Sequence, residues 1–198
     1  MLENKTILIT GGCGFVGSNL SIRLKRKFES CNIIAFDNLK RRGSELNIQR
    51  LKNDQIQFIH GDVRVKSDFE EIGDVDFIID AAAEPSVLAG LNNSADYLFN
   101  TNLTGSFFLL DFAKKNDATF IFLSTSRVYP VKALNEINLV EEENRFSISE
   151  SQNQSGISPN GISENFTLNG SRTLYGTTKL ASELFVQEYC ELFGLKAV

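Results

Sequence analysis

Short apolar runs alternate along the chain with longer segments in which apolar residues recur at helical spacing. The short runs predict buried strands over residues 5–10, 33–36, 56–59, 75–83 and 119–124. The longer segments predict helices over residues 15–27, 94–115 and 174–193. Strands that alternate with helices are typical of a parallel sheet covered on both faces, so the pattern predicts an α/β, Rossmann-type doubly wound fold.

Two segments depart from this alternation. Residues 131–172 are rich in Asn, Ser, Glu and Gly and show little periodicity, so we expect a long polar excursion on the surface. Residues 195–198 begin another apolar strand, where the chain ends. We therefore expect a single domain over 1–198 that is a fragment of a longer protein.

Composition narrows the class of protein. The 198 residues can bury a sizeable core, and a formal net charge of −5 gives no indication of nucleic-acid binding. No apolar run approaches the roughly 20 residues that cross a membrane. The three scattered cysteines indicate free thiols in the cytoplasm. A single histidine excludes histidine triads and multi-histidine metal sites, so we expect no metal.

Four glycines lie within the stretch ITGGCGFVGSN, directly after the first predicted strand. Gly11, Gly14 and Gly17 have the spacing that permits a tight turn, a close approach of a pyrophosphate to the backbone, and close packing of helix on strand. The start of the following helix offers free N–H groups to an anion. The alternative is a glycine-rich turn that binds nothing.

Asp37 follows the second predicted strand, twenty positions after Gly17. A carboxylate there can accept hydrogen bonds from a ribose 2′-OH and repels a 2′-phosphate, which favours NAD over NADP. Arg41 and Arg42 are either ligands of a 2′-phosphate or solvated loop charges. Asp62, after the third strand, can meet the adenine edge or serve only as a turn residue.

Tyr175 and Lys179 stand four residues apart on a predicted helix, hence on one face of it. A neighbouring ammonium stabilises a phenolate, so the pair can act as a general acid/base, although such spacing also arises by chance. The fifth strand ends at Ser124, Thr125 and Ser126, where a hydroxyl can hold a substrate oxygen or simply cap the strand.

Several motifs occur in order: T-G-G-C-G-F-V-G at 10–17, D-N-L at 37–39, G-D-V-R at 61–64, A-A-A at 81–83, N-L-T-G at 102–105, S-T-S-R-V-Y at 124–129 and Y-G-T-T-K at 175–179. Over nearly its whole length the chain resembles the extended short-chain dehydrogenase/reductase family of nucleotide-sugar epimerases and dehydratases. Within it, the chain most resembles the CDP-paratose (CDP-tyvelose) 2-epimerase group.

The resemblance implies an NAD(P)-binding Rossmann domain over 1–198 from which the C-terminal, nucleotide-sugar-binding domain is missing. It implies catalysis by Thr125, Tyr175 and Lys179, in cytoplasmic carbohydrate biosynthesis, by a homodimer formed through the helices at 94–115 and 174–193. The NAD site is implied to comprise Gly11, Gly14, Phe15, Val16, Gly17, Asp37, Asn38, Asp62, Val63, Ala81, Ala82, Ala83, Asn102, Ser124, Tyr175 and Lys179.

The departures from the family pattern bear on the reaction. Ser126 and Arg127 replace the Asp-Glu pair of the 4,6-dehydratases, which favours epimerisation over elimination of water. Asp80 replaces a common histidine, Pro130 replaces a frequent glycine, and Glu84 is atypical. The resemblance thus predicts a nucleotide-sugar epimerase, with a sugar reductase or decarboxylase, or a redox-silent NAD-binding module, as alternatives.

Overall fold

The computed structural model describes residues 2–91 and 94–198 of the chain. Its centre is a five-stranded parallel sheet in the order β3-β2-β1-β4-β5. The strands are β1 (Thr6–Thr10), β2 (Asn32–Asp37), β3 (Gln57–His60), β4 (Phe77–Asp80) and β5 (Thr119–Phe122). The predicted doubly wound α/β fold is confirmed.

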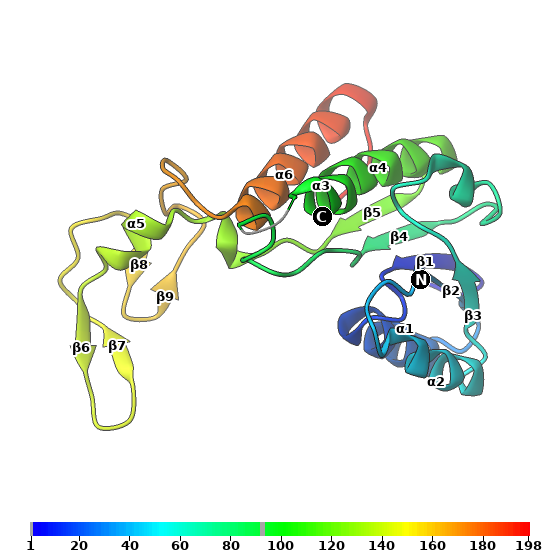
Figure 1. Ribbon diagram of the computed structural model, residues 1–198, viewed down its shortest axis with the longest axis horizontal. Helices are drawn as coiled ribbons and strands as arrows, with labels where there is room; N and C mark the ends of the chain where they lie inside the picture. The colour runs from blue at the N-terminus through cyan, green and yellow to red at the C-terminus, as the bar shows by residue number, and fades with distance from the viewer. Residues whose placement is uncertain (1, 92–93) are drawn as a thin grey trace.

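Helices cover both faces of the sheet (Figure 1). Helices α1 (Phe15–Lys27) and α2 (Asn47–Asn53) pack on one face, and α4 (Gly105–Asn116) and α6 (Leu174–Phe193) on the other. The side chains of β1 alternate accordingly: Leu8 belongs to the core beneath α4 and α6, whereas Ile7 and Ile9 belong to the core beneath α1 and α2. This alternation is the period-two pattern of a strand buried on both faces.

Two predicted strands are shorter than expected. The fourth was expected to reach residue 83, but β4 ends at Asp80 because the N–H groups of Ala81 and Ala82 donate to Thr10 Oγ1, at 3.2 and 3.1 Å. The fifth ends at Phe122 rather than at residue 124. The strand expected over 195–198 is confirmed only as a parallel bridge between Phe120 and Ala197.

The single helix predicted over 94–115 is three contiguous segments. These are α3 (Asp96–Phe99), a π-helical turn η3 (Asn100–Thr104) and α4. The wide turn contains Asn102, whose side chain accepts from the Glu84 N–H at 2.7 Å and donates to the Glu84 carbonyl at 3.2 Å. A π turn disturbs helical spacing only locally, so the apolar periodicity does not show it.

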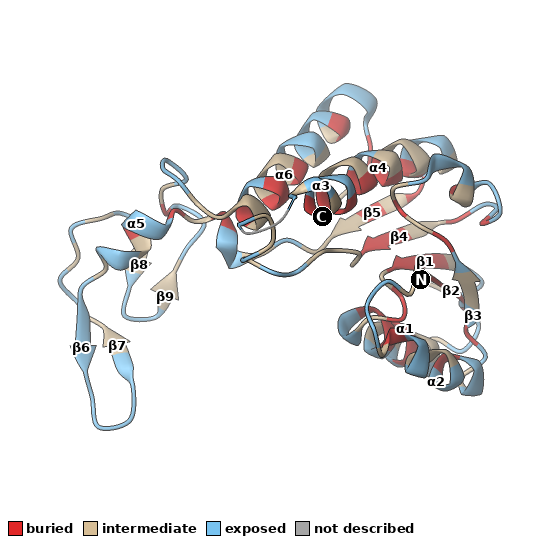
Figure 2. Ribbon diagram, viewed as in Figure 1, coloured by how far each residue is buried: buried red, intermediate tan, exposed pale blue. Residues whose placement is uncertain are grey.

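Residues 131–172 extend away from the sheet, and most of them are exposed (Figure 2). The expected excursion is therefore present, but it contains regular elements that its sequence did not predict. These are α5 (Val131–Asn135), the hairpin β6 (Leu139–Glu141) and β7 (Phe146–Ile148), and the hairpin β8 (Ile157–Ser158) and β9 (Gly161–Ile162). Strands of two or three residues are too short to establish a period.

In the part of the chain that the structure describes, three short 3₁₀ turns complete the connections: η1 (Ser44–Leu46), η2 (Lys66–Phe69) and η4 (Ser126–Val128). Within the described residues, no helix is long and apolar enough to cross a membrane.

Candidate active site

A cavity of about 820 Å³ lies at the carboxyl ends of the first four strands. In the described chain its lining includes all the residues predicted to bind NAD except Asp62, Asn102, Ser124, Tyr175 and Lys179. It also includes residues that the sequence did not single out for this site, among them Lys40, Ser44, Glu84, Pro85, Tyr97 and Thr101. Ligands of open α/β sheets bind at this edge.

The glycine loop forms one wall of the cavity. Gly11 has a φ of +60°, a backbone conformation that residues with a Cβ rarely adopt. A Cβ on Gly17 would overlap the Gly11 carbonyl oxygen, so this glycine lets α1 pack against the loop. Helix α1 follows Gly14 with no side-chain cap. The first N–H groups of α1 are thus available to an anion in the cavity.

Asp37, half-buried at the end of β2, connects the glycine loop to the next loop. Its Oδ2 accepts from the Cys13 N–H at 3.0 Å, and its Oδ1 accepts from the Leu39 N–H at 2.8 Å. Burial, and then the charge of Asp37, raise the pKa of the Cys13 thiol to about 12. Each carboxylate oxygen keeps a lone pair for a further donor, such as a ribose hydroxyl.

Asp62 is bound by its neighbours in the loop after β3. It accepts from the Arg64 N–H and Nε at 2.9 Å each, from Arg64 Nη2 at 2.6 Å, and from Asn38 Nδ2 at 2.9 Å. Burial alone would raise the pKa of the Asp62 carboxyl, but the hydrogen bonds from Arg64 and Asn38 outweigh it and lower the pKa to about 2. The Arg64 guanidinium in turn lies 4.6 Å from the ring centre of Tyr97.

A buried polar network supports the opposite wall of the cavity. Thr10 Oγ1, which accepts from the Ala81 and Ala82 N–H groups, donates to Asp80 Oδ1 at 2.9 Å. Ser106 Oγ donates to Asp80 Oδ2 at 2.6 Å and lies 3.0 Å from the Asn102 carbonyl oxygen. The network therefore fixes the backbone of the wall to β1 and α4.

The predicted acid/base residues lie at the end of β5 and the start of α6. Thr125 precedes η4, and its Oγ1 accepts from the Arg127 N–H at 3.2 Å. A Cβ on Gly176 would overlap the Arg127 carbonyl oxygen, so η4 packs directly on the first turn of α6. Tyr175, half-buried, lies in that turn. The structure thus brings the segments that carry Thr125 and Tyr175 together.

Lys179 is buried one turn further along α6. Its Nζ lies 4.0 Å from the ring centre of Phe122. Burial lowers the pKa of the Lys179 ammonium, whereas the charges of Asp80 and Glu183 act in the opposite direction. Glu183 also accepts a hydrogen bond from Ser124 Oγ.

Two residues that line the cavity carry hydroxyl groups that no described part of the protein satisfies. Ser44 Oγ and Thr101 Oγ1 are buried, and neither has a hydrogen-bond partner among the described residues. Buried hydroxyls without partners are costly, and a polar ligand in the cavity would satisfy them. Together with the uncapped start of α1 and the Asp37 carboxylate, they fit a dinucleotide. Neither hydroxyl belongs to a sequence pattern, so only the fold could reveal them.

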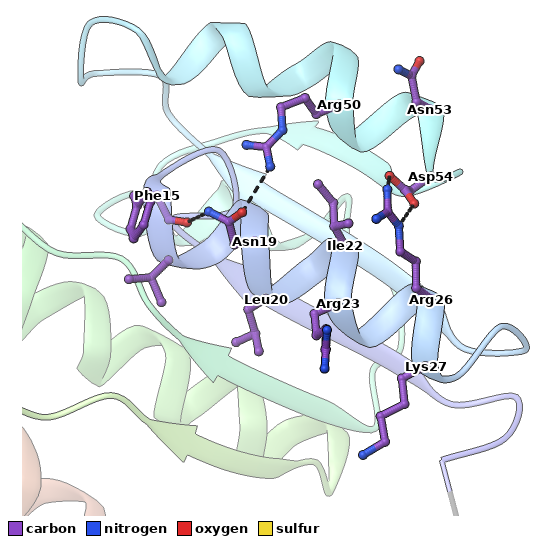
Figure 3. Close-up of a pocket in the computed structure, with 11 residues that line it drawn as sticks. Phe15, Asn19, Leu20, Ile22, Arg23, Arg26, Lys27, Arg50, Asn53 and Asp54 are labelled. Atoms are coloured by element: carbon purple, nitrogen blue, oxygen red, sulfur yellow. Dashed lines mark hydrogen bonds and ion pairs between the residues drawn. The ribbon is translucent and has the colours of Figure 1, made fainter.

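A second hollow, of about 940 Å³, lies between α1 and α2 (Figure 3). Four of its polar side chains form two pairs: Arg26 Nε donates to Asp54 at 2.6 Å, and Arg50 Nη2 donates to Asn19 at 3.1 Å. Phe15 and Val16 reach it, but Gly11, Asp37 and the residues that follow β4 line only the cavity at the strand ends. The candidate active site is therefore the cavity at the strand ends.

The profile of the NAD dependent epimerase/dehydratase family matches residues 7–198, and the chain belongs to this family. It is similar to the CDP-paratose 2-epimerase of Salmonella typhi, with 31% identity over 97% of this chain and 55% of the relative. It is also similar to the dTDP-D-glucose 4,6-dehydratase of Dictyostelium discoideum, with 30% identity over 97% of this chain and 42% of the relative.

Among solved structures, the fold is similar to that of UDP-glucuronic acid 4-epimerase from Bacillus cereus in complex with NAD, with a TM-score of 0.70 and 26% identity over 97% of this chain and 54% of that chain. The family resemblance of the motifs is thereby confirmed. The chain spans about half the length of the relatives it matches.

Proposed function

We propose that this chain is the cofactor-binding part of an NAD-dependent nucleotide-sugar epimerase, and that it supplies both the NAD site and the acid/base. The observation that carries this proposal is the packing of η4 on the first turn of α6, which brings together the segments that carry Thr125 and Tyr175. A Rossmann domain that only binds NAD needs no such pair there.

NAD is the proposed cofactor because the cavity fits it. The pyrophosphate would lie at the start of α1, and Asp37 would accept from the adenosine ribose hydroxyls. Ser44 and Thr101 would supply their unused hydroxyls. We propose that Asp62, whose carboxylate already accepts four hydrogen bonds, acts by holding Asn38 and Arg64 rather than by meeting the adenine directly.

NAD, when bound, supplies a hydride acceptor that returns the hydride later in the cycle. Tyr175 would remove the proton of the sugar hydroxyl and later return it. Lys179 would hold the nicotinamide ribose with its ammonium hydrogens and stabilise the Tyr175 phenolate. Thr125 would hold the substrate oxygen between these proton transfers.

The proposed substrate is a CDP-sugar epimerised at C2, by similarity to the CDP-paratose 2-epimerase. The dehydratase relatives raise elimination of water as another outcome. Elimination needs carboxyl groups near the leaving hydroxyl, and here Ser126 and Arg127 follow Thr125. This departure favours epimerisation.

The test uses the complete enzyme of which this chain is proposed to be the cofactor-binding part. Its substrate is a CDP-sugar that carries deuterium on the carbon to be epimerised. We expect the deuterium to stay on that carbon in the product, with no net formation of NADH, because an epimerase returns the same hydride. Stoichiometric NADH would instead indicate a dehydrogenase, and loss of the 6-hydroxyl a dehydratase. Consumption of added NADH with a keto-sugar would indicate the reductase alternative, and release of CO₂ the decarboxylase.

Tyr175→Phe provides the matched variant, since it removes a single hydroxyl. Turnover should be lost while NAD affinity stays within about threefold of the unmodified protein, because only the proton transfer is removed. Near-normal turnover in Tyr175→Phe would show that the acid/base lies elsewhere. Failure of every candidate sugar to react, with NAD bound, would favour a redox-silent module.

We also propose that the protein forms a homodimer through α4 and α6. Phe107, Leu184 and Phe185 are 37%, 54% and 42% exposed, and the ring centres of Phe107 and Phe185 are 6.3 Å apart. Phe185→Asp should convert the dimer to a monomer in light scattering, whereas Val140→Asp, a control in the excursion, should not.

We propose the cytoplasm as the compartment, supported by three free cysteines.

A further inference from the structure

Two buried side chains of opposite charge share one face of the sheet next to the acid/base. Among the described residues, Asp80 and Lys179 are the charged side chains that are nearly inaccessible, at 1% and 3% exposure. They come from β4 and α6, about a hundred residues apart in the chain, so no sequence motif links them.

The strand register places the two charges near one another. Asp80 is the parallel partner of Phe122, and side chains of partnered residues on neighbouring strands project from the same face, with the strands about 4.8 Å apart. Lys179 Nζ lies over that same Phe122 ring, 4.0 Å from its centre. The carboxylate and the ammonium therefore lie on the α4 and α6 side of adjacent strands.

Any interaction between the two groups acts through space. Within the described part of the chain, Lys179 forms no direct ion pair. The Asp80 carboxyl accepts hydrogen bonds from two hydroxyl groups, those of Thr10 and Ser106. A fixed carboxylate in surroundings of low dielectric constant acts on a nearby ammonium more strongly than it would in water.

We propose that Asp80 is a positioning residue for the acid/base: its buried carboxylate keeps Lys179 protonated, and it leaves the ammonium hydrogens of Lys179 free for a ligand. Glu183, which faces the same ammonium from α6, contributes the second negative charge but accepts a hydrogen bond from Ser124, an exposed residue that follows β5. The effect of Asp80 on NAD affinity through Lys179 rests on the function proposed above, whereas the effect of Asp80 on the charge of Lys179 does not.

The decisive variant is Asp80→Asn, which keeps the shape and removes the charge. The amide oxygen can still accept from Thr10, and the amide nitrogen can donate to Ser106, whose hydrogen can turn to the Asn102 carbonyl oxygen 3.0 Å away. Ser106→Ala is the matched control, because it breaks the same network and leaves the carboxylate in place.

The direct measurement is the titration of Lys179 in the purified chain, by NMR of lysine labelled with ¹³C at Cε, assigned with Lys179→Arg. In Asp80→Asn we expect the midpoint to fall by roughly half a unit to one unit, and in Ser106→Ala to stay nearly unchanged. An unchanged midpoint in Asp80→Asn, or an equal fall in Ser106→Ala, would overturn the proposal.

NAD titrations by fluorescence, at pH values below and above the new midpoint, separate this inference from the proposed function. Affinity should fall severalfold in Asp80→Asn only at the higher pH. A shifted midpoint with unchanged NAD affinity would support the charge coupling and refute the proposed contact of Lys179 with NAD.

If Asp80→Asn does not fold, the coupling is tested by protein stability instead. The free energy of unfolding is then compared between Lys179→Met and the double variant that carries both Asp80→Asn and Lys179→Met. The double variant should then recover folded protein, because both charges are gone. A double variant no more stable than the single ones would refute the coupling.

Discussion

Asp37 provides the sharpest test of cofactor choice, but its carboxylate has two tasks. It is proposed to accept from the adenosine ribose, and it also accepts from the backbone N–H groups of Cys13 and Leu39. Asp37→Ala would therefore remove a ligand contact and loosen the glycine loop at the same time. A fall in NAD affinity alone would not separate these effects.

The ratio of NAD to NADP affinity does separate them. Loss of a hydrogen bond between a charged carboxylate and a hydroxyl costs about 1.5–3 kcal/mol, which is roughly a 10- to 150-fold weaker Kd for NAD. NADP lacks that ribose hydroxyl and carries a phosphate that the carboxylate repels, so NADP affinity should not fall with it. Calorimetric titration of Asp37→Ala with both cofactors should show the preference for NAD reduced by about tenfold or more.

Asn47→Ala is the control for the loop. Its side chain donates to the Cys13 carbonyl oxygen at 2.9 Å, so its removal loosens the same loop without touching Asp37. It should weaken NAD and NADP alike and leave their ratio unchanged. Equal affinity of the unmodified protein for the two cofactors, or an unchanged ratio in Asp37→Ala, would refute the assignment of Asp37.

Three further outcomes are expected. The carboxyl of Asp62, with its pKa lowered to about 2, should contribute roughly 1–2 kcal/mol of stability, with solvent screening allowed for, that is fully present above pH 4 and lost as the pH falls through 2; urea unfolding between pH 2 and 6 should show this slope flattened in Asp62→Asn. Cys13, with its pKa raised to about 12, should react with iodoacetamide at pH 8 far more slowly than Cys190, as mass spectrometry of the labelled peptides would show; equal labelling would contradict the burial of Cys13. Gly17→Ala should lower the melting temperature by several degrees and abolish NAD binding, because its Cβ would overlap the Gly11 carbonyl oxygen; calorimetry checks both.

The sheet and the long helices could be predicted because their signals are local. Helix α6 has the predicted bounds: the Thr173 side chain accepts from the Gly176 N–H at its start, and Gly194 ends it with a φ of +67°. The glycine loop could likewise be predicted from the sequence, because the backbone conformation of its turn requires glycine. Periodicity and capping residues carry such information along the sequence.

The remaining features depend on contacts between distant segments. The hydroxyls of Ser44 and Thr101, which have no hydrogen-bond partner among the described residues, point to a ligand only because the fold places both residues on one cavity. The sequence left open whether Asp62 meets the adenine or serves only as a turn residue, and it did not indicate that Arg64 and Asn38 donate to its carboxylate. A sequence pattern gives the residue type at a strand end, but it does not show which neighbouring side chain forms a hydrogen bond with that residue.

The same polar network ties the cofactor cavity to the acid/base helix. Asp80 joins β1 to α4, and Asn102, one turn before α4, extends the contacts to α6: its carbonyl accepts from Ser182 Oγ at 3.0 Å, and its side chain donates to Thr178 at 3.4 Å. These contacts require the Asn102 side chain and carbonyl to face different neighbours, which the wide π turn permits. The irregular turn in an otherwise regular helix is thus what couples the position of α6, and with it the Tyr175 hydroxyl, to the wall against which the cofactor would lie.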